Sequence, residues 1–135
     1  MSSVRTRYPA PNNMINEYWG YHLILDCGGG DVKSVTNKKH IENFARDLVQ
    51  ALDMTAWGKP IVAHFAHPTD QTKTGYTLVQ LITTSSITAH FVEHDGSFYL
   101  DIFSCKVFDG DEVIRIVKEY FSPTKIRPTF LVRQA

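Results

Sequence analysis

Six segments of the chain are rich in the apolar, β-branched and aromatic residues that favour β-strands, and polar or glycine-containing turns separate them. The predicted strands cover residues 18–27, 61–65, 76–82, 87–93, 97–105 and 128–132. Asp95-Gly96, between the fourth and fifth strands, is a typical hairpin turn. Gly28-Gly29-Gly30, after the first, lacks the spacing of a nucleotide-binding loop, and we interpret it as a flexible turn.

Two other segments follow the helical period of three to four residues. The first runs from Thr36 to Met54; Thr36 or Asn37 can cap its start, and Gly58-Lys59-Pro60 lies beyond its end. Its apolar positions are Ile41, Phe44, Ala45, Leu48 and Leu52. The second helix is expected over about 111–121. This order predicts an α+β fold, a two-layer sandwich in which two helices cover one face of a mainly antiparallel sheet.

The length of 135 residues fits one domain. Residues 1–13 are expected to be a flexible tail and residues 14–135 the domain. In the tail, Arg5 and Arg7 are followed by prolines and asparagines instead of the apolar run of a signal peptide.

The formal net charge is zero at pH 7, which argues against nucleic acid or an anionic membrane as a partner. No stretch is apolar for long enough to span a membrane. The only cysteines are Cys27 and Cys105, and two thiols without a signal peptide fit the reducing cytoplasm.

Reactive side chains concentrate in one part of the chain. Four hydroxyl residues, Thr83-Thr84-Ser85-Ser86, separate two predicted strands; His90 follows, and Cys105 ends a segment that starts at Asp101. Taken singly, such residues are more typical of a polar turn, a hydrogen-bonded histidine and a buried cysteine. Together they supply a nucleophile, a base and a proton donor.

The spacing of these residues resembles the bacterial-type S-adenosylmethionine decarboxylase proenzyme family. Its members carry a cleavage-site serine, a histidine five residues later and a D-x-F-[ST]-C segment that ends fifteen residues after the histidine. Ser85, His90 and Asp101-Ile102-Phe103-Ser104-Cys105 reproduce this pattern.

Weaker similarities extend the resemblance to roughly residues 18–121. Gly20-Tyr21-His22 followed by Asp26 looks like the family's first strand, and Thr77 stands where the family often has a serine. The resemblance implies that Asp26 and Thr77 bind the substrate. It also implies a homodimer in which two sheets share the surroundings of the active site.

The resemblance further implies a precursor that cuts itself between Thr84 and Ser85, into pieces of 84 and 51 residues. The Ser85 hydroxyl would attack the Thr84 carbonyl to form an ester. β-Elimination would then break the chain and leave dehydroalanine, and loss of ammonia would convert this residue into the pyruvoyl cofactor. In this family the ketone forms a Schiff base with a substrate amine and withdraws electrons as carbon dioxide leaves. His90 would assist processing and Cys105 would protonate the substrate carbon. We expect these side chains to meet at one turn–strand junction.

The expected function is therefore decarboxylation of S-adenosylmethionine for polyamine (spermidine) biosynthesis in the cytoplasm. Three positions depart from the family pattern. Thr84 replaces the usual glutamate, residues 90–94 replace H-T-W-P-E, and Asp26 replaces a glutamate. Because the last two bear on substrate choice, decarboxylation of arginine or ornithine is an alternative. Aromatic residues that could stack on an adenine are Tyr18, Trp19, Phe65 and Phe91, although core packing is the commoner role of such residues.

Two other interpretations compete with the decarboxylase function. His64 and His67, or His90, Glu93 and His94, offer metal-ligand side chains, but they match no compact zinc motif, and no metal is expected. Alternatively, Ser85 stays uncut and the chain is a non-enzymatic ligand-binding or regulatory homologue.

Overall fold

Within residues 17–135, a single six-stranded antiparallel sheet carries the strands, in the order β2-β3-β4-β5-β1-β6. The computed structural model describes residues 17–135, so the predicted tail at residues 1–13 lies outside the described residues. The strands are β1 (Gly20–Gly28), β2 (Ala56–Phe65), β3 (Gly75–Ile82), β4 (Ser85–Phe91), β5 (Phe98–Ser104) and β6 (Lys125–Arg133). The helices are α1 (Val32–Val35), α2 (Lys38–Ala51) and α3 (Gly110–Phe121), with a 3₁₀ turn at Gln71–Lys73.

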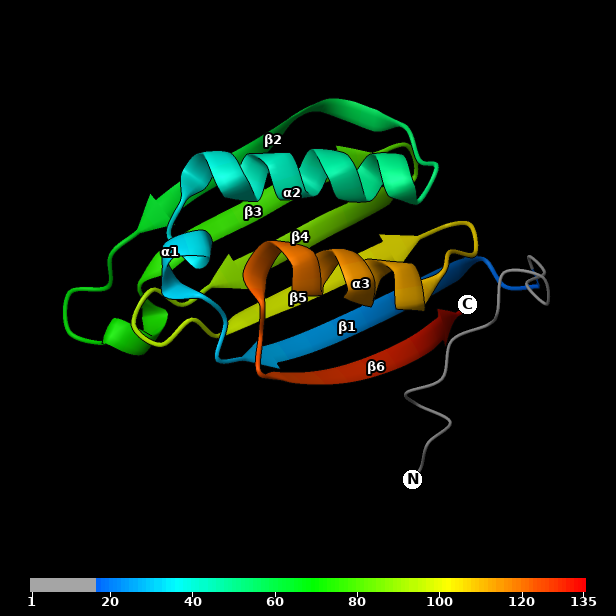
Figure 1. Ribbon diagram of the computed structural model, residues 1–135. Helices are drawn as coiled ribbons and strands as arrows, with labels where there is room; N and C mark the ends of the chain where they lie inside the picture. The colour runs from blue at the N-terminus through cyan, green and yellow to red at the C-terminus, as the bar shows by residue number, and fades with distance from the viewer. Residues whose placement is uncertain (1–16) are drawn as a thin grey trace.

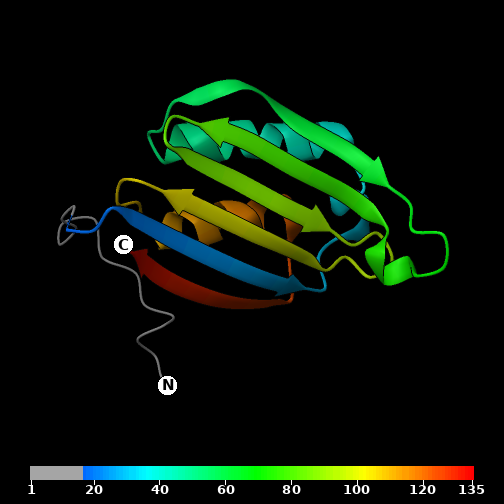
Figure 2. The same cartoon turned by 180° about the vertical axis from the view of Figure 1, so that it is seen from behind.

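The helices α2 and α3 lie side by side on one face of the sheet (Figure 1), and the view from behind shows the other face without a helix (Figure 2). This confirms the predicted α+β sandwich. None of the described helices is long and apolar enough to span a membrane.

A polar side chain caps the N-terminus of each long helix. The Asn37 side chain accepts a 3.0 Å hydrogen bond from the His40 N–H, as the sequence predicted for α2. Asp109 accepts one of 3.0 Å from the Asp111 N–H at the start of α3. Helix α2 ends at Ala51, three residues before the predicted end, because Asp53 turns into the left-handed region at φ 54°.

Aromatic rings fill the space between the helices and the sheet. Phe121 of α3 lies 4.9 Å from Phe44 of α2 and 5.1 Å from Phe91 and Phe98 of the sheet, measured between ring centroids. Burying each ring contributes about 1.5–3 kcal/mol to folding. Phe91 is 3% exposed, so it belongs to the core and cannot stack on a ligand.

Three predicted strands differ from the structure in ways that matter for the fold or the site. Strand β2 begins at Ala56 instead of residue 61, because Gly58-Lys59-Pro60 forms a bulge inside the strand and not a loop before it. Strand β4 begins at Ser85, so this serine is a strand residue and not a turn residue. Strand β6 runs over nine residues along β1 and is longer than the predicted 128–132.

The glycine turn after β1 is packed against a second turn. The Gly30 N–H donates a 3.1 Å hydrogen bond to the Gly96 carbonyl, and a Cβ on Gly30 would lie 2.6 Å from that oxygen. The residue is therefore needed for a close approach of two backbones. The interpretation of residues 28–30 as merely a flexible turn was wrong in this respect.

The face of the sheet opposite the helices, which we call the open face, is partly apolar. Side chains alternate between the two faces along each strand, so those of β1 at positions 22, 24 and 26 point to the open face. Exposed large apolar and aromatic side chains on this face are 40–72% accessible: Trp57, Ile61, Phe65, Leu81, Tyr99 and Leu131. An apolar surface of this extent is typical of an interaction face.

Candidate active site

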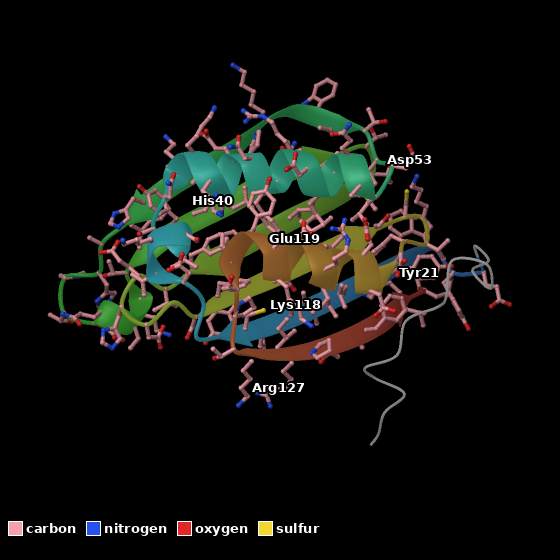
Figure 3. All side chains as sticks on the ribbon, viewed as in Figure 1. Tyr21, His40, Asp53, Lys118, Glu119 and Arg127 are labelled. Atoms are coloured by element: carbon pink, nitrogen blue, oxygen red, sulfur yellow. The ribbon has the colours of Figure 1, made fainter. Side chains whose placement is uncertain are left out.

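Ser85 lies at the rim of the sheet, directly after the turn that joins β3 to β4. It is paired with Ile82 across the turn and with Ser104 of β5. Thr83 and Thr84 form the two-residue turn, and Thr84 has a positive φ of 55°. The rim of the sheet that carries this turn is marked in Figure 3 by Tyr21, which is in register with Ser104, and by Asp53.

The Ser85 hydroxyl is held by groups from the end of β5. Its oxygen accepts a 3.2 Å hydrogen bond from the backbone N–H of Cys105 and lies 4.0 Å from the Cys105 sulfur. It also lies 3.4 Å from the hydroxyl of Ser104, which is fully buried. A backbone N–H that donates to a hydroxyl oxygen favours loss of the hydroxyl proton, because its hydrogen bond to the alkoxide is stronger. The predicted proximity of Ser85 and Cys105 is therefore seen in the structure.

A cavity of about 150 Å³ opens beside Ser85 between the sheet and the end of α2. Lys106 spans it, because its ammonium donates a 2.6 Å hydrogen bond to the backbone carbonyl of Asp53. The lining residues are Asp53, Met54, Thr55, Ile82, Thr83, Ser85, Ser104, Cys105 and Lys106. The chain thus places a hydroxyl, a thiol and a small cavity together.

His90 and Thr77 form a second cluster at the other end of the sheet. The Thr77 hydroxyl and His90 Nδ1 are hydrogen-bonded at 3.1 Å across β3 and β4. Tyr99 is the next residue in register, followed by Asp26 of β1. All four point to the open face, so this row joins His90 to both predicted substrate-binding residues. A second cavity, of about 270 Å³, opens over Thr77, His90 and Tyr99.

The two clusters do not meet within one chain. Ser85 and His90 are five residues apart on the same strand, which corresponds to about 16 Å at 3.3 Å per residue. An odd separation also directs their side chains to opposite faces of the sheet. The expectation that Ser85, His90 and Cys105 converge at one junction is therefore wrong for His90. It arose because the strand was predicted to begin at Ile87, which left Ser85 in the turn.

Sequence reasoning missed two residues of the Ser85 cavity. Ser104 was quoted only as part of a motif, yet strand pairing places it directly opposite Ser85. The alternation of faces along β5 indicates that Ser104 is buried, so this contact had a signal in the sequence. Lys106 had none, because its partner Asp53 lies 53 residues away.

The histidines that suggested a metal site have other partners. His64 is hydrogen-bonded to Glu93 at 2.8 Å, and the His67 ring accepts from the backbone N–H groups of Thr69 and Asp70. Within residues 17–135, no three side chains of ligand type come together to hold a metal ion.

The two cysteines differ in their surroundings. Cys27 of β1 is buried, and burial raises the pKa of its thiol to about 12, with a further contribution from the charge of Asp26. Cys105 is half-buried and lines the Ser85 cavity. Of the two, only Cys105 is placed to take part in chemistry.

Comparison with known proteins shows the family of the chain. The family model described as S-adenosylmethionine decarboxylase matches residues 21–134. The chain belongs to this family. S-adenosylmethionine decarboxylase proenzymes of Clostridium botulinum strains Loch Maree and 657 are each 32% identical over 104 residues, which cover 76% of this chain and 84% of the relative. The S-adenosylmethionine decarboxylase family consists of carboxy-lyases, so the chain is assigned to that enzyme class.

A solved structure shows the same fold. The adenosylmethionine decarboxylase from Aquifex aeolicus superposes with a TM-score of 0.71 at 18% identity, covering 87% of this chain and 92% of the other. The sheet and its two covering helices are therefore the fold of the S-adenosylmethionine decarboxylase family.

Proposed function

We propose that this chain is a proenzyme that cuts itself between Thr84 and Ser85, and that the resulting pyruvoyl enzyme decarboxylates S-adenosylmethionine for polyamine synthesis in the cytoplasm. The observation that carries the proposal is the Ser85 hydroxyl, held at 3.2 Å by the Cys105 N–H beside the Cys105 thiol. Family membership and the proenzyme names of the relatives support it.

The chain's own residues perform the processing. The Ser85 hydroxyl attacks the Thr84 carbonyl carbon, and the hydrogen bond from the Cys105 N–H favours loss of the hydroxyl proton, because it is stronger to the resulting alkoxide. The amide between Thr84 and Ser85 becomes an ester, whose β-elimination releases the Thr84 carboxylate and leaves dehydroalanine at position 85. Hydrolysis by water then releases ammonia and gives the pyruvoyl group. When formed, the pyruvoyl group supplies an electrophilic ketone that accepts electrons as carbon dioxide leaves. The Cys105 thiol then stands within reach to return a proton to the substrate carbon.

His90 must come from a second copy of the chain if it takes part in this site. The open faces of two sheets would pack about 10 Å apart. Thr88, Asp101 and Ile24 are neighbours across three strands. A two-fold axis that crosses the strands at this level would place His90 of one chain over Ser86 of the other, because both lie two residues from Thr88. Thr83 and Thr84 are exposed at the rim of the sheet, and the proposal requires that the partner's His90 reach the scissile bond there. The exposed apolar side chains of this face support such a homodimer.

The substrate would then bind between the two sheets. Trp19 is 54% exposed and lies 5.9 Å from the ring of Phe103, on the same rim of the sheet as Ser85, so it is the best-placed candidate to stack on the adenine. Asp26 and Thr77 of the partner's His90 row offer a carboxylate and a hydroxyl for the ribose or the sulfonium.

Intact-mass analysis after synthesis tests the cleavage. Two pieces of 84 and 51 residues are expected, the smaller with a blocked N-terminus, whereas Ser85→Ala should remain whole. A chain that stays uncut and releases no carbon dioxide from any substrate would establish the non-enzymatic alternative. With cut protein, carbon dioxide release from S-adenosylmethionine, arginine and ornithine compared side by side identifies the substrate.

Mixing two inactive variants tests the two-chain site. Ser85→Ala and His90→Ala chains carrying different tags are co-expressed. In a mixed dimer, the Ser85→Ala chain still presents His90 to the Ser85 of its partner. We expect the His90→Ala chain to be cut in the mixture and not alone. Equal cleavage of His90→Ala with and without its partner would refute the shared site.

A further inference from the structure

Thr84 holds an unfavourable backbone conformation at the bond that is to break. Its φ of 55° lies in the left-handed region. Within residues 17–135, positive φ values of non-glycine residues occur at Asp53, Thr84 and Ser122, and Thr84 is the only β-branched residue among them. Aspartate tolerates this region, whereas a β-branched side chain there is a steric outlier.

The contacts of Thr84 itself do not offset this cost. Its side chain is exposed and makes no hydrogen bond to any described residue. The constraint comes from its neighbours. The Thr83 N–H donates a 3.1 Å hydrogen bond to the Thr55 carbonyl, and Ser85 is paired with both Ile82 and Ser104. Because both sides of the turn are fixed, the flanking pairings hold Thr84 in the left-handed conformation.

We propose that this strain drives the self-cleavage, and that Thr84 is a positioning residue for it. The inference rests on the proposed function. When Ser85 Oγ bonds to the Thr84 carbonyl carbon, the carbon–nitrogen bond breaks, and the freed nitrogen of Ser85 keeps the electron pair and takes the hydroxyl proton. No other reagent is needed for this step.

The ester relieves the turn because it is longer than the amide. It links the Thr84 carbonyl carbon to Ser85 Cα through Oγ and Cβ, a path with one more atom than the direct route through nitrogen. The added atom lets Thr84 rotate out of the left-handed region while Ser85 keeps its pairing with Ser104. Strain in the amide that is absent from the ester shifts their equilibrium toward the ester.

Substitutions at position 84 separate strain from side-chain chemistry. Thr84→Val keeps the β-branch and removes the hydroxyl. Thr84→Asn and Thr84→Gly relieve the strain, and asparagine does so without the added flexibility of glycine. We expect Val to cut at the rate of Thr, and Asn and Gly to cut about tenfold more slowly, with correspondingly less ester trapped by hydroxylamine. Intact mass measured over time after synthesis gives the rates.

Stability in an uncut background provides a second readout. Combined with Ser85→Ala, the Asn variant at position 84 should unfold at higher urea concentration than the Thr and Val variants. Ser122→Gly is the matched control, because Ser122 also has a positive φ, of 46°, but follows α3 far along the chain from the cleavage site. It should leave the cleavage rate unchanged.

Four other results would contradict the inference. If Asn and Gly cut as fast as Thr while the unsubstituted chain is processed, strain has no role and the proposed function stands. If Val is as slow as Asn, the hydroxyl of Thr84 acts and the strain does not. If Asn brings no gain in stability in the uncut background, the turn is unstrained. An unsubstituted chain that never cuts refutes the proposed function and this inference together.

Discussion

The backbone N–H of Cys105 donates a 3.2 Å hydrogen bond to the hydroxyl oxygen of Ser85, and the thiol of the same cysteine lies 4.0 Å from that oxygen. One residue therefore presents two groups to the serine. The N–H is oriented by the course of β5 and does not depend on the side chain. The two groups can consequently be removed separately by mutation.

Substitution of Cys105 should distinguish processing from turnover. Cys105→Ala keeps the N–H, so we expect cleavage within about threefold of the unsubstituted rate, with decarboxylation strongly reduced. Cys105→Pro removes the N–H, and because a hydrogen bond to a developing charge contributes about 1.5–3 kcal/mol, cleavage should slow at least about tenfold. Intact mass and carbon dioxide release measure the two effects, and circular dichroism verifies that both variants fold. Equal cleavage of the alanine and proline variants would disprove a role for the N–H.

Thiol modification should separate the two cysteines. The pKa of Cys27 is raised to about 12, so this thiol remains protonated and unreactive at pH 8. Iodoacetamide at pH 8 should therefore label folded protein at Cys105 alone, as read by peptide mass spectrometry. Cys105→Ala should take up no label until urea unfolds it. Labelling of Cys27 in the folded chain would contradict the burial that raises its pKa.

The hydrogen bond between Thr77 and His90 should affect processing if His90 serves in it. Thr77→Val removes the hydroxyl that lies 3.1 Å from His90 Nδ1, and we expect cleavage about fivefold slower, in line with a hydrogen bond of about 1 kcal/mol. Thr77→Ser retains the hydroxyl and should restore the rate and its pH dependence. A valine variant with an unchanged pH–rate profile would show that Thr77 does not orient the ring.

A charge on the open face, close to the proposed two-fold axis, should separate two chains. Ile61 is 61% exposed and lies in the row of Val79 and Thr88, along which the proposed two-fold axis runs. Ile61→Glu would bring two like charges together there, so we expect monomers by sedimentation and, because the site is shared, little cleavage. Lys118→Glu, on the exposed side of α3, is the control and should remain dimeric and processed. A cleaved Ile61→Glu monomer would exclude the two-chain site.

Two glycines with positive φ should tolerate alanine very differently. A Cβ on Gly58 would meet nothing within 4 Å, so Gly58→Ala should cost only the left-handed conformation, about 1–2 kcal/mol. A Cβ on Gly96 would lie 2.1 Å from the Gly30 carbonyl oxygen, so Gly96→Ala should be destabilising by several kcal/mol more. Urea unfolding compares the pair. Similar losses would mean that the two turns do not pack as closely as described.

Local patterns predicted the elements of this fold well, because their causes are local. The cap at Asn37 and the buried face of α2 follow from side chains three or four residues apart. The bulge at Gly58-Lys59-Pro60 was missed because its residues are typical of a turn, and only pairing with β3 keeps them in a strand. The bridge from Lys106 to Asp53 depends on tertiary structure and has no local signal.

The candidate site was predicted as a set of residues and not as an arrangement. The spacing of Ser85, His90 and Cys105 identified the family, and strand pairing places Cys105 beside Ser85. The position of His90 could have been anticipated from the odd number of residues that separates it from Ser85, had the strand been extended to Ser85. Whether two chains complete the site depends on a partner that a single sequence does not describe.

The strand order has a consequence for the products of a cut after Thr84. The first piece would contain β1, β2 and β3, and the second β4, β5 and β6. In the sheet, β1 lies between β5 and β6, so a strand of one piece is inserted between two strands of the other. The two pieces would be interleaved, and neither could leave without breaking three ladders of hydrogen bonds (β3 with β4, β5 with β1, and β1 with β6) and opening the core. Cleavage of the backbone would thus leave two polypeptides that stay associated in the native fold. They would migrate together in gel filtration until a denaturant separates them.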